Sequence, residues 1–162
     1  MIKHLDIKPT IQTDLDELNT LARFEDKREV EEITGRPLID NLEYGYLNAQ
    51  PCISARTLDG QLLAIIGIVP DSKLNHEIYG RFGRIAMVGT KALPRHRTAV
   101  LRGSQAYLKT LEKDYDFLHN VCDARNSLHI KWLKWLGFSV GETHFPHGAR
   151  QIPVHYFYKR CY

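Results

Sequence analysis

The sequence of 162 residues is poor in cysteine and has no long apolar run, and both shortages limit what the protein can be. Its three cysteines, Cys52, Cys122 and Cys161, are an odd number at wide spacing, so they predict neither a disulfide framework nor a metal knuckle. A reducing compartment is the simpler expectation. The longest apolar run, residues 62–69, falls far short of the roughly 20 residues that a membrane helix needs. We therefore expect no membrane segment and no signal peptide.

Internal repeats, low-complexity segments and linkers are also missing, so nothing in the sequence divides the chain. Hydrophobic residues make up 43% and charged residues 25%, which is ordinary for a soluble globular protein. We expect a single domain over residues 1–162, long enough to bury a core without cross-links.

Charge is present but unevenly placed. Residues 1–60 hold 7 Lys or Arg and 12 Asp or Glu, a net charge of −5, whereas residues 61–162 hold 15 and 7, a net charge of +8. The positive part suits an anionic partner, whether the phosphates of a coenzyme, a nucleic acid or another protein. A solvated basic surface without a partner is the competing interpretation.

Hydrophobic periodicity predicts strands and helices in the order of a mixed α/β domain. Thr13 or Asp14 is expected to cap the first helix, and Gly67 to mark a bulge. We interpret the charge-rich residues 25–34 as a solvated helical surface and not as an active site. The predicted strands are residues 5–9, 52–56, 61–69, 84–90, 117–121, 139–144 and 154–159, and the predicted helices are residues 14–22, 25–34, 38–47, 98–114 and 126–136.

The stretch from Val121 to Phe138 holds the most informative pattern. A strand leads into a polar turn, Asn126 is placed to cap the helix that follows, and Gly137 is placed to end it. Leu128, Trp132, Leu133, Trp135 and Leu136 share one stripe of that helix, which predicts a face buried against a sheet.

Asn126, Leu133 seven residues later, and Gly137 followed by Phe138 resemble the last helical motif of the GNAT N-acetyltransferases. A tighter resemblance is to the GNAT-like internal virion and assembly proteins of short-tailed phages, through Asn126, His129, Ile130, Lys131, Trp132, Leu133, Lys134 and Gly137. The resemblance implies an α/β (α+β) GNAT-like three-layer fold. It would have a mixed, mostly antiparallel sheet of six to seven strands and about four helices.

The resemblance also implies where acetyl-CoA would bind. GNAT enzymes hold the coenzyme A pyrophosphate in a glycine-rich turn after the fourth strand, where main-chain N–H groups can approach the phosphates. The corresponding residues 91–98 contain no glycine, and they offer side-chain cations in its place. The expected coenzyme-binding residues are Val88, Arg95, His96, Arg97, Thr98 and Asn126.

Residues that could transfer a proton during acetyl transfer are also hard to identify in the sequence. Many GNAT enzymes place a tyrosine seven residues after the motif asparagine, where Leu133 stands here and cannot donate a proton. Tyr107 and Tyr115 fall on a stripe that we expect to be buried. Asp71 or Glu77 is a candidate general base, and the catalytic residues stay unknown.

Histidines and tryptophans have more ordinary interpretations. His129 lies within the apolar stripe and is expected to be buried and bonded to a backbone carbonyl. Three histidines of the C-terminal segment, His144, His147 and His155, match no common zinc spacing, so we expect no metal. Both tryptophans are expected in a core or an interface. A run of aromatic residues interleaved with Lys or Arg is missing, so a sequence-specific nucleic-acid target is not expected.

Three functions remain open. The first is a phage GNAT-fold virion-associated or assembly protein of the internal virion or ejection type, with a degenerate acetyl-CoA site. Its partners would be other virion proteins or a host protein, and it would be found in the virion and the host cytoplasm. The alternative is an active acetyl-CoA-dependent N-acetyltransferase acting on a protein or a small amine. A small binding protein that uses the cleft between two parallel strands for another ligand is the third.

Overall fold

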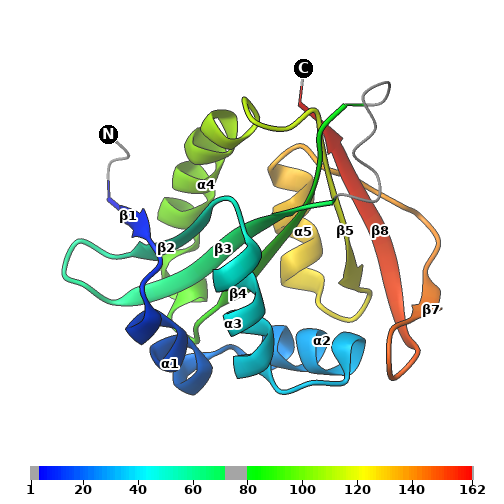
Figure 1. The fold of residues 1–162 in the computed structure, drawn as a ribbon, viewed down its shortest axis with the longest axis horizontal. Helices are drawn as coiled ribbons and strands as arrows, with labels where there is room; N and C mark the ends of the chain where they lie inside the picture. Colours follow the sequence, from blue (N-terminus) through cyan, green and yellow to red (C-terminus); the bar gives the residue numbers. More distant parts are fainter. Residues whose placement is uncertain (1–3, 72–79, 162) are drawn as a thin grey trace.

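A mixed β-sheet with helices on both of its faces forms the framework of the computed structural model, which describes residues 4–71 and 80–161 (Figure 1). The helices are α1 (Gln12–Leu21), α2 (Phe24–Thr34), α3 (Leu38–Asn48), the 3-10 helix η1 (Leu93–His96), α4 (Arg97–Leu111) and α5 (Ser127–Trp135). The strands are β1 (Asp6–Pro9), β2 (Cys52–Arg56), β3 (Leu62–Pro70), β4 (Phe82–Gly89), β5 (Phe117–Asp123), β6 (Ser139–Val140), β7 (Phe145–His147) and β8 (Ile152–Arg160).

The strand order is β1-β2-β3-β4-β5-β8-β6, with β7 paired to β8. Only β4 and β5 run parallel among the described strands, so the sheet is mostly antiparallel as expected. The described residues form eight strands and five α-helices, slightly more than the six to seven strands and about four helices expected. The extra strand arises because the predicted strand 139–144 is a two-residue strand, β6, and a separate β7 follows it.

Apolar side chains form a core on each face of the sheet. Leu15, Leu18 and Leu42 of α1 and α3 pack with Leu62 and Ile65 of β3 on one face. Leu108 and Leu133 of α4 and α5 pack with Leu118 and Phe157 on the other. Strand β3 contributes buried side chains to both cores, which confirms that this continuously apolar segment is central.

Strands β4 and β5 pair only where they begin. Their register runs from Phe82 opposite Phe117 to Arg84 opposite His119 and then ends. Beyond it, β5 pairs along its whole length with β8, while β4 stays paired with β3. The carboxyl ends of the two parallel strands are therefore separated by a gap, which we call the β4–β5 gap.

Two local predictions about turns and bulges were wrong. Helix α1 begins at Gln12, and Asp14 is its third residue; its carboxylate accepts the Ile11 N–H at 3.0 Å from inside the helix. The register shift of the β2–β3 pair lies between Ala55 and Arg56, not at Gly67. Gly67 instead allows a close approach, because a Cβ there would lie 3.2 Å from the Cβ of Ala49.

The segment around α5 follows the prediction closely, with one exception. Gly137 has φ +90°, the left-handed conformation expected of a residue that ends a helix. The Phe138 N–H donates to the Leu133 carbonyl at 3.0 Å, which closes the helix end. Trp132 is buried, but Trp135 is 57% exposed, so the apolar stripe is narrower than predicted.

Candidate functional site

The β4–β5 gap exposes one edge of β4. Thr90 donates its N–H to the Leu63 carbonyl of β3, whereas the Ile85 carbonyl accepts the Asn120 side-chain amide of β5 at 3.0 Å. Because backbone groups alternate along a strand, those of Ile85, Met87 and Gly89 face the gap. This edge is where a ligand inserted between the two strands would find backbone partners.

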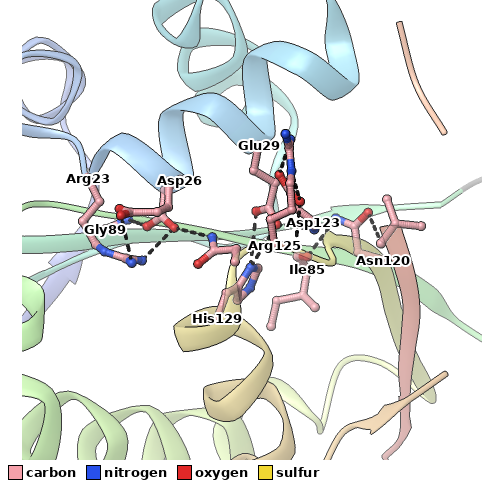
Figure 2. A network of polar contacts seen from close by, with 12 residues as sticks. Arg23, Asp26, Glu29, Ile85, Gly89, Asn120, Asp123, Arg125 and His129 are labelled. Carbon is pink, nitrogen blue, oxygen red and sulfur yellow. Dashed lines mark hydrogen bonds and ion pairs between the residues drawn. The ribbon is translucent and has the colours of Figure 1, made fainter. Parts of the chain in front are cut away.

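Asp26 of α2 fills one end of the gap (Figure 2). Its Oδ2 accepts the Gly89 N–H at 2.8 Å, and its Oδ1 accepts the Asn126 side-chain amide at 2.9 Å. Arg23 donates to the same Oδ1 at 2.9 Å, and its backbone N–H donates to the Gly89 carbonyl at 2.8 Å. A Cβ on Gly89 would lie 2.4 Å from the Leu93 side chain, so this close packing requires glycine.

Glu29, one turn later on α2, contacts β5 and α5 through its carboxylate (Figure 2). Its Oε1 accepts the Asp123 N–H at 2.5 Å, and its Oε2 lies 3.3 Å from Nδ1 of His129. Arg125 donates to the Asp123 carboxylate and also pairs with Glu32. Two α2 carboxylates, both buried, thus bond backbone groups on each side of the β4–β5 gap.

These contacts overturn the interpretation of residues 25–34 as a solvated surface. Asp26 is 3% exposed and Glu29 is 6% exposed. A signal was present in the sequence, because Asp26 and Glu29 are three residues apart and so are neighbours on the helix surface. The mixed charges of this segment are also typical of a solvated helix, and no local pattern shows that these side chains pack against a sheet.

The two motif residues Asn126 and His129 have different partners from those expected. Asn126 stands at the N-cap position of α5, as predicted, but it makes no side-chain cap hydrogen bond because its amide is directed to Asp26. His129 is buried as predicted, but its partner is Glu29 and not a backbone carbonyl. Burial alone would lower the pKa of His129, yet the Glu29 and Asp26 carboxylates outweigh it and raise that pKa.

Two cavities meet at the gap. The larger, about 270 Å³, lies between α2, α3 and strands β3 to β5, and Glu29 lies in its wall. The smaller, about 60 Å³, lies under α4 and α5 on the other face. Ile85, Met87, His129 and Phe157 line both cavities, so the two cavities adjoin at the β4–β5 gap.

The basic residues 91–98 lie at the junction of β4 and α4, where the resemblance expects a phosphate site. Arg95, Arg97 and Thr98 are exposed there. His96, and not Thr98, occupies the N-cap position of α4, and it makes no side-chain cap bond. The structure therefore leaves side-chain cations available, and their binding of a coenzyme stays a prediction.

The remaining expected coenzyme residue, Val88, lies on β4 beside the gap. Its side chain is buried in the core under α1 and α3, and its backbone pairs with Ile65 of β3. Val88 and Asn126 are thus near the gap, whereas the basic residues lie at the exposed junction.

Among residues 4–71 and 80–161, no side chain stands out as an acid or base for acyl transfer. Leu133 is buried in the core, and burial raises the pKa of the Tyr107 hydroxyl. The Tyr115 hydroxyl donates to the Gln50 carbonyl at 2.6 Å. Asp71 lies 3.4 Å from Nε2 of His119, a buried residue that the sequence did not single out. Glu77 lies outside the described residues.

Within residues 4–71 and 80–161, no three His, Cys, Asp or Glu side chains come together as a metal site, and His144, His147 and His155 form no such cluster. The same part of the chain has no helix both long and apolar enough to cross a bilayer. Cys52, Cys122 and Cys161 are all free thiols, as expected.

Comparison with known proteins gives matches of structure alone. No protein-family model matches the chain, and no curated protein does. A GNAT-family acetyltransferase from Bacillus anthracis superposes with a TM-score of 0.69 at 14% identity, covering 99% of this chain and 97% of that one. Ribosomal-protein-alanine N-acetyltransferase from Brucella melitensis gives 0.68 at 16% identity, covering 96% and 99%.

Spermidine N-acetyltransferase from Vibrio cholerae, solved with CoA and spermine, gives a TM-score of 0.66 at 15% identity, covering 97% of this chain and 95% of that one. At such low identity the likeness concerns the fold and not the activity. Together with the parallel β4–β5 pair that opens into a gap, it shows that this chain has the mixed α/β fold of the GNAT acetyltransferases.

Proposed function

We propose that this chain is a GNAT-fold protein with a degenerate coenzyme cleft, which serves as an assembly or virion-associated protein and does not transfer acetyl groups. One observation carries the proposal: Asp26 and Glu29 of α2 already bond the Gly89 and Asp123 N–H groups on the two sides of the β4–β5 gap. A coenzyme that bonded the Gly89 or Asp123 N–H would have to displace these carboxylates.

Displacement would be costly. Hydrogen bonds to charged groups contribute about 1.5–3 kcal/mol each, and Asp26 receives three of them, from Gly89, Asn126 and Arg23. Moved off these donors, the carboxylate would still be buried unless α2 shifted. The glycine-free turn at residues 91–98 and the apolar Leu133 supply nothing that offsets this cost.

Calorimetry of the purified protein with acetyl-CoA tests the proposal. We expect no detectable heat with millimolar coenzyme. Micromolar binding that is lost in the double variant Arg95→Ala/Arg97→Ala would overturn it, because a coenzyme held by the junction cations would then be present. Lys131→Ala/Lys134→Ala, which removes two exposed lysines of α5, is the matched control for a general loss of positive charge.

Active acetyl transfer is the second candidate, and one observation favours it. The exposed Arg95 and Arg97 lie at the start of α4, and a cavity of about 270 Å³ adjoins the β4–β5 gap. A release assay for free coenzyme A thiol, run with alanine-terminated peptides and with spermidine as acceptors, would detect such an enzyme. Turnover above the uncatalysed rate would replace the first proposal by this one.

The proposal also assigns the chain to a phage, as a virion-associated protein. This assignment is supported by the pattern around Asn126 and His129, and these two side chains are the partners of Asp26 and Glu29. The motif is therefore explained by closure of the gap and not by catalysis. Mass spectrometry of purified virions of the encoding phage should detect the chain, and its absence from particles would contradict a virion role.

A further inference from the structure

Strand β8 carries exposed side chains on one face of the sheet, and β5 beside it carries buried and half-buried ones. Helices α1 and α3 pack on β3, and α2 packs on β4, so these helices lie over the other strands of that face (Figure 1). On β8, Tyr156, Tyr158 and Arg160 are exposed, whereas Phe157 between them is buried in the core under α4 and α5. The two tyrosines and the arginine therefore point away from α4 and α5.

Cross-strand register gathers aromatic and cationic side chains on this face. Phe117 lies opposite Arg160, His119 lies opposite Tyr158, and Arg84 of β4 lies opposite His119. No single run of the sequence contains this combination, because it is assembled from three strands. We call it the aromatic–arginine face, defined by Arg84, Phe117, His119, Tyr156, Tyr158 and Arg160.

The rings of this face stack on one another. Phe117 and Tyr158 have centroids 5.6 Å apart with planes 12° apart, and Tyr156 and Tyr158 have centroids 6.1 Å apart with planes 28° apart. Tyr156 and Tyr158 are nonetheless 37% and 38% exposed. Rings that cover each other's faces show their edges to solvent, and aromatic edges are electropositive.

The ionic groups of the face add positive charge. The Arg84 side chain is 52% exposed, and its partner Asp71 is 3.8 Å away, between Nε and Oδ2. Arg160 is exposed and forms no ion pair within residues 4–71 and 80–161. Asp71 lies near Arg84 and also contacts His119, at 3.4 Å from its Nε2.

We propose that the aromatic–arginine face docks an acidic, extended segment of a partner protein. Tyrosine and arginine are the side chains that most often dominate binding energy at protein interfaces, and carboxylates complement both guanidinium groups and ring edges. Nucleic-acid bases would need open ring faces on which to stack, and stacking among the rings themselves occupies those faces.

The neighbouring cavity refines the chemistry of this partner. Arg84 and Val121, which lie on the same sheet face, also line the cavity of about 270 Å³. One large apolar side chain of the docked segment can enter there while its acidic neighbours meet Arg84 and Arg160. The segment therefore combines acidic residues with one apolar anchor.

Fluorescence anisotropy with a short labelled peptide of glutamates around a central phenylalanine tests the inference. We expect saturable binding that weakens as salt is added. The variants Tyr156→Ala/Tyr158→Ala and Arg84→Glu/Arg160→Glu should each weaken it by about tenfold or more. The control Lys134→Glu/Trp135→Ala, which alters an exposed cation and an exposed aromatic on α5, should leave the affinity unchanged.

Circular dichroism of each variant separates loss of docking from loss of folding. Equal affinity of all folded variants, or no binding of the acidic peptide by the unaltered protein, would overturn the inference. Tighter binding of labelled oligothymidine that depends on Tyr156 and Tyr158 would assign the face to single-stranded nucleic acid instead. Failure here would leave the closed-gap proposal intact, because that proposal is measured with acetyl-CoA.

Discussion

Asp26 is the residue on which the most contacts of the site converge. Its carboxylate joins β4 through Gly89, α5 through Asn126, and the start of α2 through Arg23. Of the contacts to β4 and α5, the one between residues closest in sequence joins Asp26 to Gly89, which are 63 residues apart. A buried carboxylate with this set of partners holds together segments that local interactions could not.

Replacing Asp26 by alanine should therefore lower the free energy of unfolding by about 3 kcal/mol, because Arg23, Asn126 and the Gly89 N–H lose a buried charged partner. Urea denaturation measures the change. Glu43→Ala, an exposed acid in the interior of α3, is the control and should change stability by less than about 0.5 kcal/mol. Equal effects of the two substitutions would refute the role assigned to Asp26.

His129 adds a pH dependence of known sign. Burial lowers its pKa, but the Glu29 and Asp26 carboxylates raise it above the ordinary value of 6.5 overall. A raised pKa in the folded state means that the stabilisation is fully present below 6.5 and is lost as pH rises through the raised value. The stability difference between the unaltered protein and His129→Gln should thus shrink as pH rises from about 6 to about 9.

Denaturation series at several pH values for both proteins provide the measurement. His119 titrates in the opposite direction, because burial lowers its pKa despite Asp71, but it is present in both proteins and cancels in the difference. A difference that grew with pH would show that His129 is not held by the α2 carboxylates.

Residue identity was only partly predictable. The positions of Asn126 and His129 on α5 follow from helical periodicity, and both are where the sequence places them. Their partners Asp26 and Glu29 lie 100 residues away, and no local pattern connects such groups. The sequence could show that α2 has a charged face, but only the tertiary fold shows that this face is buried.

At the level of elements, Gly137 ends α5 in a left-handed conformation, with φ +90°. An added Cβ would meet only ordinary contacts, at 3.6 Å from the Lys159 side chain, so the cost of a substitution comes from the backbone. Gly137→Ala should destabilise the protein by about 1–2 kcal/mol.

Gly45→Ala is the matched substitution with the opposite sign. Gly45 lies inside α3 with open space around its Cα, so alanine should stabilise by about 0.5–1 kcal/mol. Melting temperatures of the two variants provide the comparison. An unchanged or raised melting temperature of Gly137→Ala would contradict the helix-end assignment of Gly137.

Most elements were predictable because each has its own local signal. The helix-ending glycine Gly137 and the apolar β3 segment predict elements close to those found. Failures lie where long-range contacts act on the local structure: Asp14 bonds the Ile11 N–H from the third position of α1 and also bonds Ser54 and Arg56 of β2. The predicted strand 154–159 lies within β8, whereas the predicted strand 139–144 was wrong because the pairing of β6 and β7 with β8 depends on turns within residues 141–151.

At the level of the whole molecule, a single sheet runs through all described strands and carries a core on each face. We predict that residues 1–162 unfold as one domain. Tryptophan fluorescence, which reports on α5, and far-ultraviolet circular dichroism, which reports on all helices, should give coincident urea transitions. Two separate transitions would contradict a single domain.

The architecture was predictable through the order of elements and the motif resemblance, and it is confirmed by the GNAT-fold neighbours. The contacts within the β4–β5 gap could not be predicted from the sequence. The missing glycines in residues 91–98 predict a weak phosphate site. The carboxylates at the β4–β5 gap, however, come from α2, which precedes Asn126 and His129 by about a hundred residues.

Nuclear magnetic resonance of the isotope-labelled protein tests that filling most directly, through the backbone amide of Gly89 and the side-chain amide of Asn126. Both donate to Asp26, so we predict that neither signal moves when millimolar acetyl-CoA is added. Saturable shifts of both signals would show that the coenzyme displaces the carboxylate, and would contradict a gap closed by the protein's own side chains.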